Sequence, residues 1–199
     1  MYGYSVGSGG ALTALSGSPY AAGTQPSAIA SDAKSAYAYV TDFLGNDVLA
    51  YAISTTTGST GKLVPLTTGT GGTNKFQAVN QPTSIVVDPS FAFAYVANGQ
   101  DATVSAYSIS NGTLTGVGTS SASTNTYQVG LEPVAIGVDP STNHFLYTAN
   151  YLGDNLSSFE LSQTIGTLVQ GQGSPFGTNQ LPTALVAIPH AGTGSGISP

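Results

Sequence analysis

The side chains that could do chemistry in this chain are few and mostly acidic. Its 199 residues contain no cysteine, two histidines, three cationic residues and nine acids, which give a net charge of −6 at pH 7. The cations are all lysines, so the arginine forks that usually hold phosphate or carboxylate groups are missing. Thiolate chemistry is excluded, and so few cations make nucleic acid an unsuitable partner.

Acidic and amide side chains recur at two kinds of position. Those directly before a proline are Gln25, Gln81 and Glu132. Those that follow an apolar segment are Asp42, Asn46, Asp47, Asn98, Asp101, Asn150, Asp154 and Asn155. We predict that these residues form a polar binding surface. Glu132 is the candidate catalytic residue, because it is the one glutamate before a proline and general-base catalysis needs a positioned carboxylate. The Asp-x-Asp-x-Asp-Gly spacing of calcium loops does not occur, so neither a metal nor a cofactor is predicted.

Three further aspartates, Asp32, Asp88 and Asp139, recur at the end of another apolar segment, and two of them precede proline. Asp followed by Pro is typical of a turn, so we interpret these carboxylates as structural. His144 and His190 are expected at the same end of the fold as these turns, away from the candidate residues. The sequence therefore supports neither a Ser-His-Asp triad nor a histidine metal site.

The elements that must position these residues come from a motif that repeats three times. The copies begin at Pro26, Pro82 and Pro133, and Pro182 starts a fourth, so the spacings are 56, 51 and 49 residues. Each copy contains three segments rich in β-branched and aromatic residues, named strands A, B and C, and a Gly-x-Leu step into strand D. In the first copy they are 26–32, 36–42, 47–53 and 61–63. A period near 50 with four strands predicts an all-β fold made of propeller blades.

The two ends match parts of the same motif. Residues 1–25 are predicted to hold strands C and D of a partial blade, and 26–81, 82–132 and 133–181 one blade each. Residues 182–199 are predicted to hold strand A of a further blade and a Gly/Ser-rich tail. The expectation is a single β-propeller domain of about three and a half four-stranded antiparallel blades. The D–A and B–C loops then gather at one mouth, where five acids and one lysine, Lys75, predict a negative potential.

Two short motifs in the repeat resemble a known family. Residues 39–42, 95–98 and 147–150 read Tyr-Val-Thr-Asp, Tyr-Val-Ala-Asn and Tyr-Thr-Ala-Asn, and a Gly-Ser-Pro-aromatic step occurs at 17–20 and 173–176. They are similar to the Tyr-Val-Thr-Asn repeat of lactonase-type seven-bladed propellers, which include 6-phosphogluconolactonase. The resemblance implies an active site at the mouth where the D–A and B–C loops gather. It also implies lactone hydrolysis, and the chain has about half the length that seven blades need.

Two functions are compatible with these features. We favour a non-catalytic repeat module that either binds a protein or a small neutral ligand or has a structural role, because histidine and arginine are scarce and the loops are polar and uncharged. The alternative is a lactone hydrolase that acts at the mouth. The negative potential predicted there disfavours a phosphorylated lactone. Low charge and abundant Ser and Thr suggest an extracytoplasmic or secreted protein, although no signal peptide is recognisable and no apolar run approaches a membrane span.

An incomplete propeller leaves open sheet edges, which proteins usually avoid. Three ways of closing them are compatible with the sequence. The chain can be part of a longer protein that carries the missing blades. Two copies can join as a two-fold homodimer that completes seven blades. Finally, the C-terminal strand A can pair with the N-terminal strands C and D of the same chain, which gives a four-bladed ring.

Overall fold

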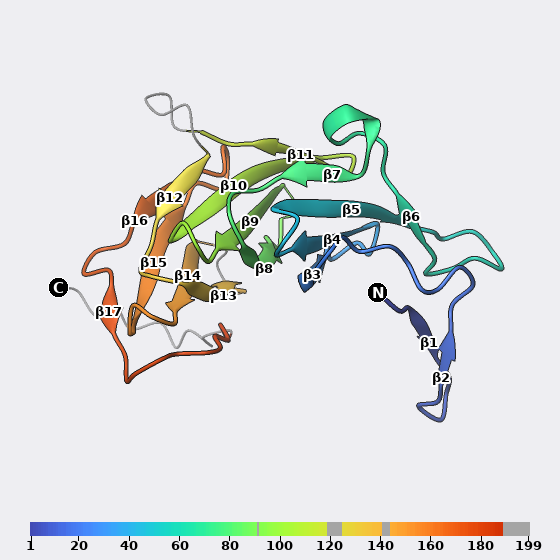
Figure 1. Cartoon of the computed structure of the whole chain (residues 1–199), viewed down its shortest axis with the longest axis horizontal. Coiled ribbons are helices and arrows are strands. Elements are labelled where there is room, and N and C mark those ends of the chain that lie inside the picture. The colour runs from blue at the N-terminus through green and yellow to red at the C-terminus, as the bar shows by residue number, and fades with distance from the viewer. Residues whose placement is uncertain (91, 119–124, 141–143, 189–199) are drawn as a thin grey trace, which may run out of the picture.

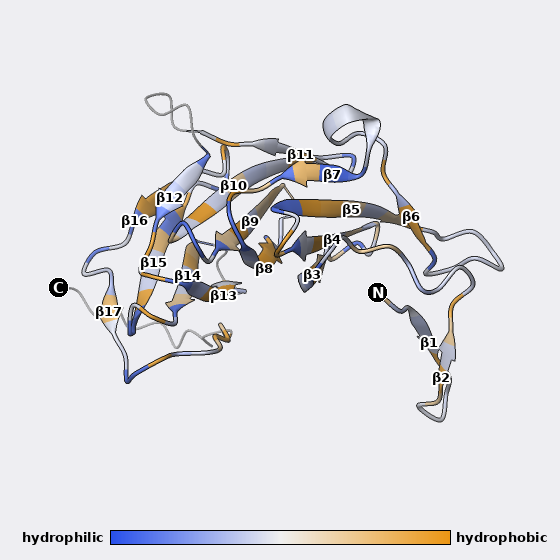
Figure 2. Ribbon diagram, in the orientation of Figure 1, coloured by the Kyte–Doolittle hydropathy of each residue, from blue (hydrophilic) through white to orange (hydrophobic). Residues whose placement is uncertain are grey.

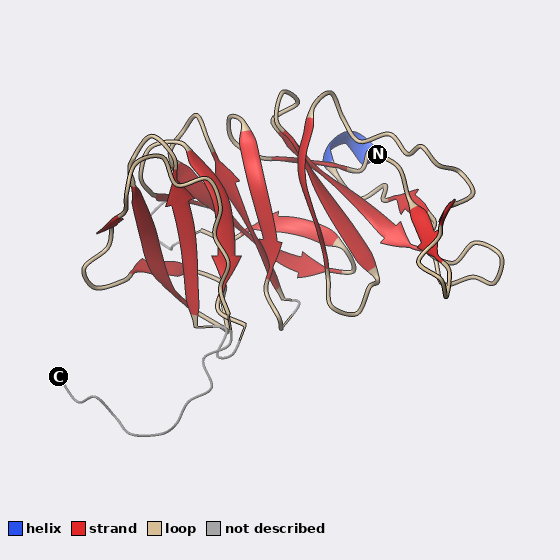
Figure 3. Cartoon of the chain, turned by 90° about the horizontal axis from the view of Figure 1, so that it is seen from below, coloured by secondary structure: helices blue, strands red, loops and turns tan. Residues whose placement is uncertain are grey.

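The computed structural model describes residues 1–90, 92–118, 125–140 and 144–188. In this part of the chain the fold is all-β, with three large antiparallel sheets, a separate hairpin and one short 3-10 turn, η1 (Thr70–Gly72). The sheets stand side by side as blades (Figures 1 and 3). Their first strands contact one another along the inner side of the array. The predicted propeller architecture is therefore confirmed.

Within each blade, the first four strands are neighbours in space in the order in which they follow in the sequence. The first blade contains β3 (Pro26–Ser31), β4 (Tyr37–Asp42), β5 (Asp47–Ile53), β6 (Leu63–Pro65) and β7 (Lys75–Gln77). The second contains β8 (Pro82–Val87), β9 (Phe93–Asn98), β10 (Thr103–Ser110), β11 (Thr113–Gly116) and β12 (Thr126–Gln128). The third contains β13 (Pro133–Val138), β14 (Phe145–Asn150), β15 (Asn155–Leu161), β16 (Leu168–Gln170) and β17 (Phe176–Gly177). The hairpin consists of β1 (Tyr4–Val6) and β2 (Leu12–Ala14).

At its outer edge, each blade differs in detail from the expected four strands. Two short strands share the position of strand D, and both pair with strand C: β6 and β7 with β5, β11 and β12 with β10, and β16 and β17 with β15. The chain leaves the sheet between the two halves, in the first blade through η1. Such short segments carry little alternation of polar and apolar residues, so their pattern did not reveal the second half.

The recurrent aspartates hold the turns between strands A and B. The Oδ1 atom of Asp32 accepts hydrogen bonds from the backbone N–H groups of Ala36 (2.7 Å) and Tyr37 (2.8 Å). Asp88 accepts the bond from the N–H group of Ala92 in the same way, at 3.1 Å. Both aspartates are buried. The structural role predicted for these two carboxylates agrees with the geometry, because a buried carboxylate needs such donors.

The hydrophobic core lies between the blades. One cluster joins the first and second blades, and includes Tyr39, Val48 and Phe76 on one side and Ile85, Val96 and Tyr107 on the other. A second cluster joins the second and third blades, with Phe93, Tyr95 and Val104 facing Ile136, Leu146 and Phe159. Figure 2 shows hydrophobic stretches along β5, β8 and β14. Each blade therefore has a forward face, which meets the next blade, and a rear face, which meets the previous one.

Polar contacts repeat along the same seams. The hydroxyl group of Ser27 donates to the carbonyl oxygen of Pro82 at 2.7 Å, and that of Thr83 donates to the carbonyl oxygen of Pro133 at 2.6 Å. Ser or Thr directly after the first proline of a blade thus bonds to the proline that begins the next blade. These bonds keep the start of each inner strand, and the loop before it, in a fixed position.

The hairpin of β1 and β2 and the last described residues, 182–188, lie at opposite ends of the blade array (Figure 1). The predicted hairpin of residues 1–25 is present as β1 and β2. Residues 182–188, predicted to be strand A, are not assigned to a strand. Their Leu185 nevertheless packs against β13, where a Cβ atom added to Gly137 would lie 2.8 Å from its Cδ2 atom. The four-bladed ring within one chain is not formed, because the segments that would pair are far apart.

We expect the fold to lose stability in alkaline solution. Burial raises the pKa of Tyr39, Tyr95 and Tyr107 above the ordinary tyrosine value. At a pH above about 10 the unfolded chain therefore releases tyrosine protons that the folded chain keeps, so the free energy of unfolding falls as pH rises. Urea denaturation at about pH 8 and about pH 11 would measure the decrease. A free energy of unfolding that stays constant over this interval would contradict the burial of these hydroxyl groups.

Candidate functional site

A pocket of about 320 Å³ lies where the D–A and B–C loops of the second and third blades meet. It is lined by Gln81, Gly99, Gln100, Leu131, Glu132 and Leu152. Gln81 and Glu132 each precede the first proline of a blade, and Gly99 and Gln100 directly follow β9. The structure thus brings together two of the residues that the sequence placed at the mouth. We refer to this pocket as the Glu132 pocket.

Glu132 is half-buried at the start of β13. Its carboxylate has no hydrogen-bond or ion-pair partner among the described residues. The backbone of Glu132 has a φ of 51°, but Gln81 (55°) and Leu181 (56°) share this left-handed conformation. The conformation is therefore a property of the repeat and not a special feature of this site. What distinguishes Glu132 is a carboxylate that the fold does not use.

Two of the residues that line the pocket mark a departure of the second blade from the repeat. The two residues that follow strand B are Phe43 and Leu44 in the first blade and Tyr151 and Leu152 in the third, but Gly99 and Gln100 in the second. The backbone has the same hydrogen bond in the first and second blades. The N–H group of Gly99 donates to the carbonyl oxygen of Gln81 at 2.8 Å, and the N–H group of Phe43 donates to the carbonyl oxygen of Gln25. An aromatic ring is thus replaced by a hydrogen atom. Sequence reasoning missed Gly99 and Gln100, although this break in the repeat could have revealed them.

Asp42 has a structural role. Its side chain is fully buried and accepts the backbone N–H groups of Thr24 (2.8 Å) and Gln25 (2.7 Å). Gly23 and Gly45 lie so close that a Cβ atom on either would be about 2 Å from its Oδ2 atom. Asp42 therefore fixes the D–A loop that contains Gln25, and its carboxylate is not accessible to a ligand.

We predict that Asp42→Ala destabilises the protein by roughly 1.5–3 kcal/mol, the range for hydrogen bonds to charged groups. The reason is that two backbone donors lose their acceptor and the tight space between two glycines is left empty. Urea denaturation would measure the change. Asp154→Ala is the control, because Asp154 is exposed and its side chain accepts one N–H group, that of Leu181 at 2.7 Å. Equal losses in both variants would contradict the structural role of Asp42.

The other B–C loop residues also hold neighbouring loops. Asn46 accepts the N–H group of Gln81 at 2.9 Å through its Oδ1 atom. Asp101 accepts the N–H group of Asn80 at 2.9 Å and its side-chain amide at 3.0 Å. Asn46 and Asp154 thus bond to a D–A loop that follows them in the chain, whereas Asp101 bonds to the D–A loop that precedes it. Their oxygen atoms are used to position the mouth.

The amides at the ends of strands B are buried. The Nδ2 atom of Asn150 donates to Asn155 and to the hydroxyl group of Ser157 (2.9 Å). The Nδ2 atom of Asn98 donates to the hydroxyl group of Ser105 at 3.0 Å. The Oδ1 atom of Asn98 is buried and has no hydrogen-bond partner among the described residues. Neither amide lines the Glu132 pocket, so the structure does not bring the two together with Glu132.

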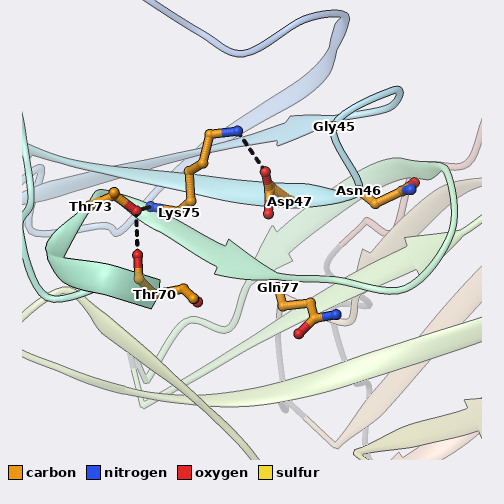
Figure 4. Close-up of a pocket in the computed structure, with 7 residues that line it drawn as sticks. All are labelled: Gly45, Asn46, Asp47, Thr70, Thr73, Lys75 and Gln77. Atoms are coloured by element: carbon orange, nitrogen blue, oxygen red, sulfur yellow. Dashed lines mark hydrogen bonds and ion pairs between the residues drawn. The ribbon is translucent and has the colours of Figure 1, made fainter.

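A second polar pocket, of about 310 Å³, lies beside the first blade. It is lined by Gly45, Asn46, Asp47, Thr70, Thr73, Lys75 and Gln77, which Figure 4 shows. Lys75 Nζ lies 2.8 Å from Asp47 Oδ2, and the hydrogen bond to Asp47 raises the pKa of Lys75. The mouth lysine is therefore already paired with an acid and does not line the Glu132 pocket.

In the described part of the chain, no group of three or more His, Asp or Glu side chains is arranged to hold a metal ion. The same part of the chain includes no helix that is long and apolar enough to cross a membrane. His144 lines a different pocket with Phe145, Glu160 and Leu161, and none of these residues lines the Glu132 pocket. His190 lies outside the described residues.

Comparison with known proteins identifies the relatives of this chain. The family model for lactonase, 7-bladed beta-propeller, matches residues 1–178. Among solved structures, a protein from Lactobacillus plantarum has a TM-score of 0.72 at 20% identity and covers 92% of this chain and 50% of its own. The periplasmic gluconolactonase PpgL of Pseudomonas aeruginosa has a TM-score of 0.59 at 21% identity, with coverages of 76% and 41%. No curated protein matches.

The chain thus spans about half the length of the solved structures that it resembles, or less. At these identities the structural matches establish the fold alone. The family model covers most of the chain, and the repeated blades and the inter-blade core agree with it. This chain therefore belongs to the lactonase family of seven-bladed β-propellers.

Proposed function

We propose that the Glu132 pocket is a site for the hydrolysis of an uncharged lactone. The observation that supports this proposal is that four of the five acids at the mouth have hydrogen-bond or ion-pair partners. Asp42, Asp101 and Asp154 accept hydrogen bonds from neighbouring loops, and Asp47 is paired with Lys75. Glu132 is the acid of this set that keeps an unused carboxylate in a pocket.

The chemistry requires one base and a few hydrogen-bond donors. The Glu132 carboxylate takes a proton from a water molecule as the water oxygen attacks the lactone carbonyl carbon. The bond between that carbon and the ring oxygen then breaks, and the ring oxygen receives the proton, so the product is a hydroxy acid. The side-chain amides of Gln81 and Gln100 line the same pocket and can donate hydrogen bonds to the carbonyl or hydroxyl oxygens of the substrate.

The charge of the pocket favours an uncharged substrate. Its lining contains one acid and no cation. A phosphorylated lactone would bring two negative charges beside Glu132 without a partner for them, which costs free energy in a partly buried site. The name of PpgL describes that relative as a gluconolactonase, which is consistent with an unphosphorylated substrate.

The test is a hydrolysis assay of the purified chain with an aldonolactone and with its phosphorylated counterpart. We expect turnover of the uncharged lactone, and a lower kcat/KM for the phosphorylated one. The difference should shrink at high salt, because screening weakens repulsion between charges. Rates equal to the spontaneous hydrolysis of both lactones would reject the proposal.

A second candidate is the non-catalytic module that the sequence favoured. It is supported by the use of most mouth residues in holding loops, which leaves little polar surface for catalysis. Under this proposal the same pocket binds a small neutral ligand without turning it over, and the protein acts outside the cytoplasm. Binding of an uncharged sugar that saturates without any hydrolysis would favour the module over the hydrolase.

A further inference from the structure

Two of the side chains that line the Glu132 pocket are large, apolar and exposed. Leu131 and Leu152 are 61% and 57% exposed, and neither belongs to the hydrophobic core clusters of the described residues. A single exposed leucine is common on protein surfaces and needs no explanation. Two of them on one small pocket, beside a carboxylate that the fold does not use, are not accounted for by the packing of the blades.

Leu131 departs from the repeat. The residue two positions before the first proline is polar at the other three blade starts, where it is Thr24, Asn80 or Gln180. The side-chain amide of Asn80 donates to Asp101 at 3.0 Å and so helps to hold its loop. A leucine cannot make such a bond, and it adds an apolar branched side chain to the pocket instead.

The exposure of Leu152 is a property of its loop. Leu44 is the equivalent residue of the first blade and is also 57% exposed, although the second blade packs against the first. A following blade therefore does not cover this position. The two leucines differ in their surroundings, because Leu152 lines the Glu132 pocket and Leu44 does not.

Backbone hydrogen bonds hold the two leucines next to each other. The N–H group of Tyr151 donates to the carbonyl oxygen of Glu132 at 2.8 Å, and that of Gly153 donates to the carbonyl oxygen of Leu131 at 3.1 Å. These bonds lie on either side of Leu152. The loops approach so closely that a Cβ atom added to Gly153 would lie 3.0 Å from the backbone nitrogen of Leu131. The apolar side of the pocket is therefore formed before any ligand binds.

We propose that Leu131 and Leu152 form a subsite for a hydrocarbon chain, so that the preferred substrate is a lactone with an alkyl substituent on its ring. This inference rests on the proposed function, in which Glu132 is the base, and it names the class of uncharged lactone that the pocket takes. The alkyl chain packs against the two leucines, and the ring carbonyl faces the water molecule that Glu132 activates. The chain takes no part in the reaction, and the product is a hydroxy acid that keeps it.

The composition of the lining favours such a ligand over a fully hydroxylated lactone. Ligand sites are typically apolar with a few polar groups that fix the orientation, and here the polar groups are one carboxylate and two amides. An alkyl chain removes the surface of both leucines from water, which is favourable. Ring hydroxyl groups placed against the same leucines would lose water without gaining a hydrogen-bond partner there, which is costly.

The test is the hydrolysis of a series of lactones of increasing chain length: γ-butyrolactone, γ-valerolactone, γ-hexalactone and γ-octalactone. We expect kcat/KM to rise by about two- to fourfold for each added carbon, the upper value being that for complete burial of a methylene group. The value for γ-octalactone should also exceed that for an uncharged aldonolactone. This comparison needs no variant and so does not depend on the folding of one.

The double variant Leu131→Ser with Leu152→Ser should remove most of the dependence on chain length and change kcat/KM for γ-butyrolactone little. Leu131→Met should keep the dependence, because methionine is also large and apolar. Leu44→Ser is the matched control, since Leu44 has the same place in its blade and the same exposure but lies outside the pocket. It should behave as the unmodified protein.

The outcomes separate this inference from the function on which it rests. Turnover with the same kcat/KM for all four chain lengths would overturn the alkyl subsite and leave the hydrolase standing. The same conclusion would follow if the double variant kept the full dependence on chain length, or if the aldonolactone were the better substrate. No turnover of any of these lactones would reject both the subsite and the hydrolase.

Discussion

Replacing Glu132 by glutamine is expected to lower kcat for an uncharged lactone by about 10²–10⁴-fold, the usual contribution of a general base. Glutamine has nearly the same shape, but its amide cannot accept a proton from water at neutral pH. The carboxylate of Glu132 makes no hydrogen bond or ion pair with other described residues, so the fold should not change. KM should change little, because the lining of the pocket is otherwise intact.

Glu160→Gln is the matched control, since Glu160 is the other glutamate of the chain and lines a pocket that shares no residue with the Glu132 pocket. Its kcat should equal that of the unmodified protein. Urea denaturation of both variants would show that their stabilities are similar. If Glu132→Gln retained full activity, Glu132 would not be the base, and if both variants lost activity equally, the effect would not be specific to the pocket.

Replacing Tyr95 by alanine is expected to destabilise the protein by about 3–5 kcal/mol, as for other large aromatic residues in a core. The Tyr95 side chain is fully buried between the second and third blades, and its hydroxyl group donates to the carbonyl oxygen of Gly166 at 3.2 Å. The replacement leaves a cavity in the seam and an unpaired carbonyl group. The destabilisation should appear as a lower urea midpoint, with the slope of the transition unchanged.

Tyr147→Ala provides the comparison, because Tyr147 is the equivalent residue of the third blade and is only half-buried on the open forward face. Its loss should cost less than about 2 kcal/mol, since part of the ring already contacts water. Equal costs at the two positions would mean that the forward face of the third blade is covered in solution. This pair of variants therefore also reports on the open edge.

The sequence predicted the strands well because their pattern is local and repeated. The segment expected for strand C of the first blade coincides with β5, and those expected for strands A and B differ from β3 and β4 by one residue at an end. Asp32 and Asp88 were correctly interpreted as turn residues, since Asp commonly bonds to the backbone a few residues away. The second half of strand D was not recognised, because it is short and follows a loop of variable length.

The candidate site could be predicted only in part. Sequence position placed the polar residues at one mouth, but it could not show which of them the fold uses. Gln81 and Asn46 are 35 residues apart and their hydrogen bond depends on the blade geometry. The same holds for Leu181 and Asp154, which are 27 residues apart. Because these partners cannot be recognised from the sequence alone, Asn46 and Asp154 were as good candidates for binding a ligand as Glu132.

By itself, the sequence determined the repeat, the all-β fold and the scarcity of groups that could do chemistry, because these follow from composition and from spacing along the chain. The tertiary structure decided which carboxylate remains unused and where a pocket opens. The Glu132 carboxylate remains unused because no neighbouring loop in the described part of the chain presents a donor to it, and Gly99 has no side chain where the other two blades have aromatic rings. Both depend on contacts between blades, which bring distant residues together.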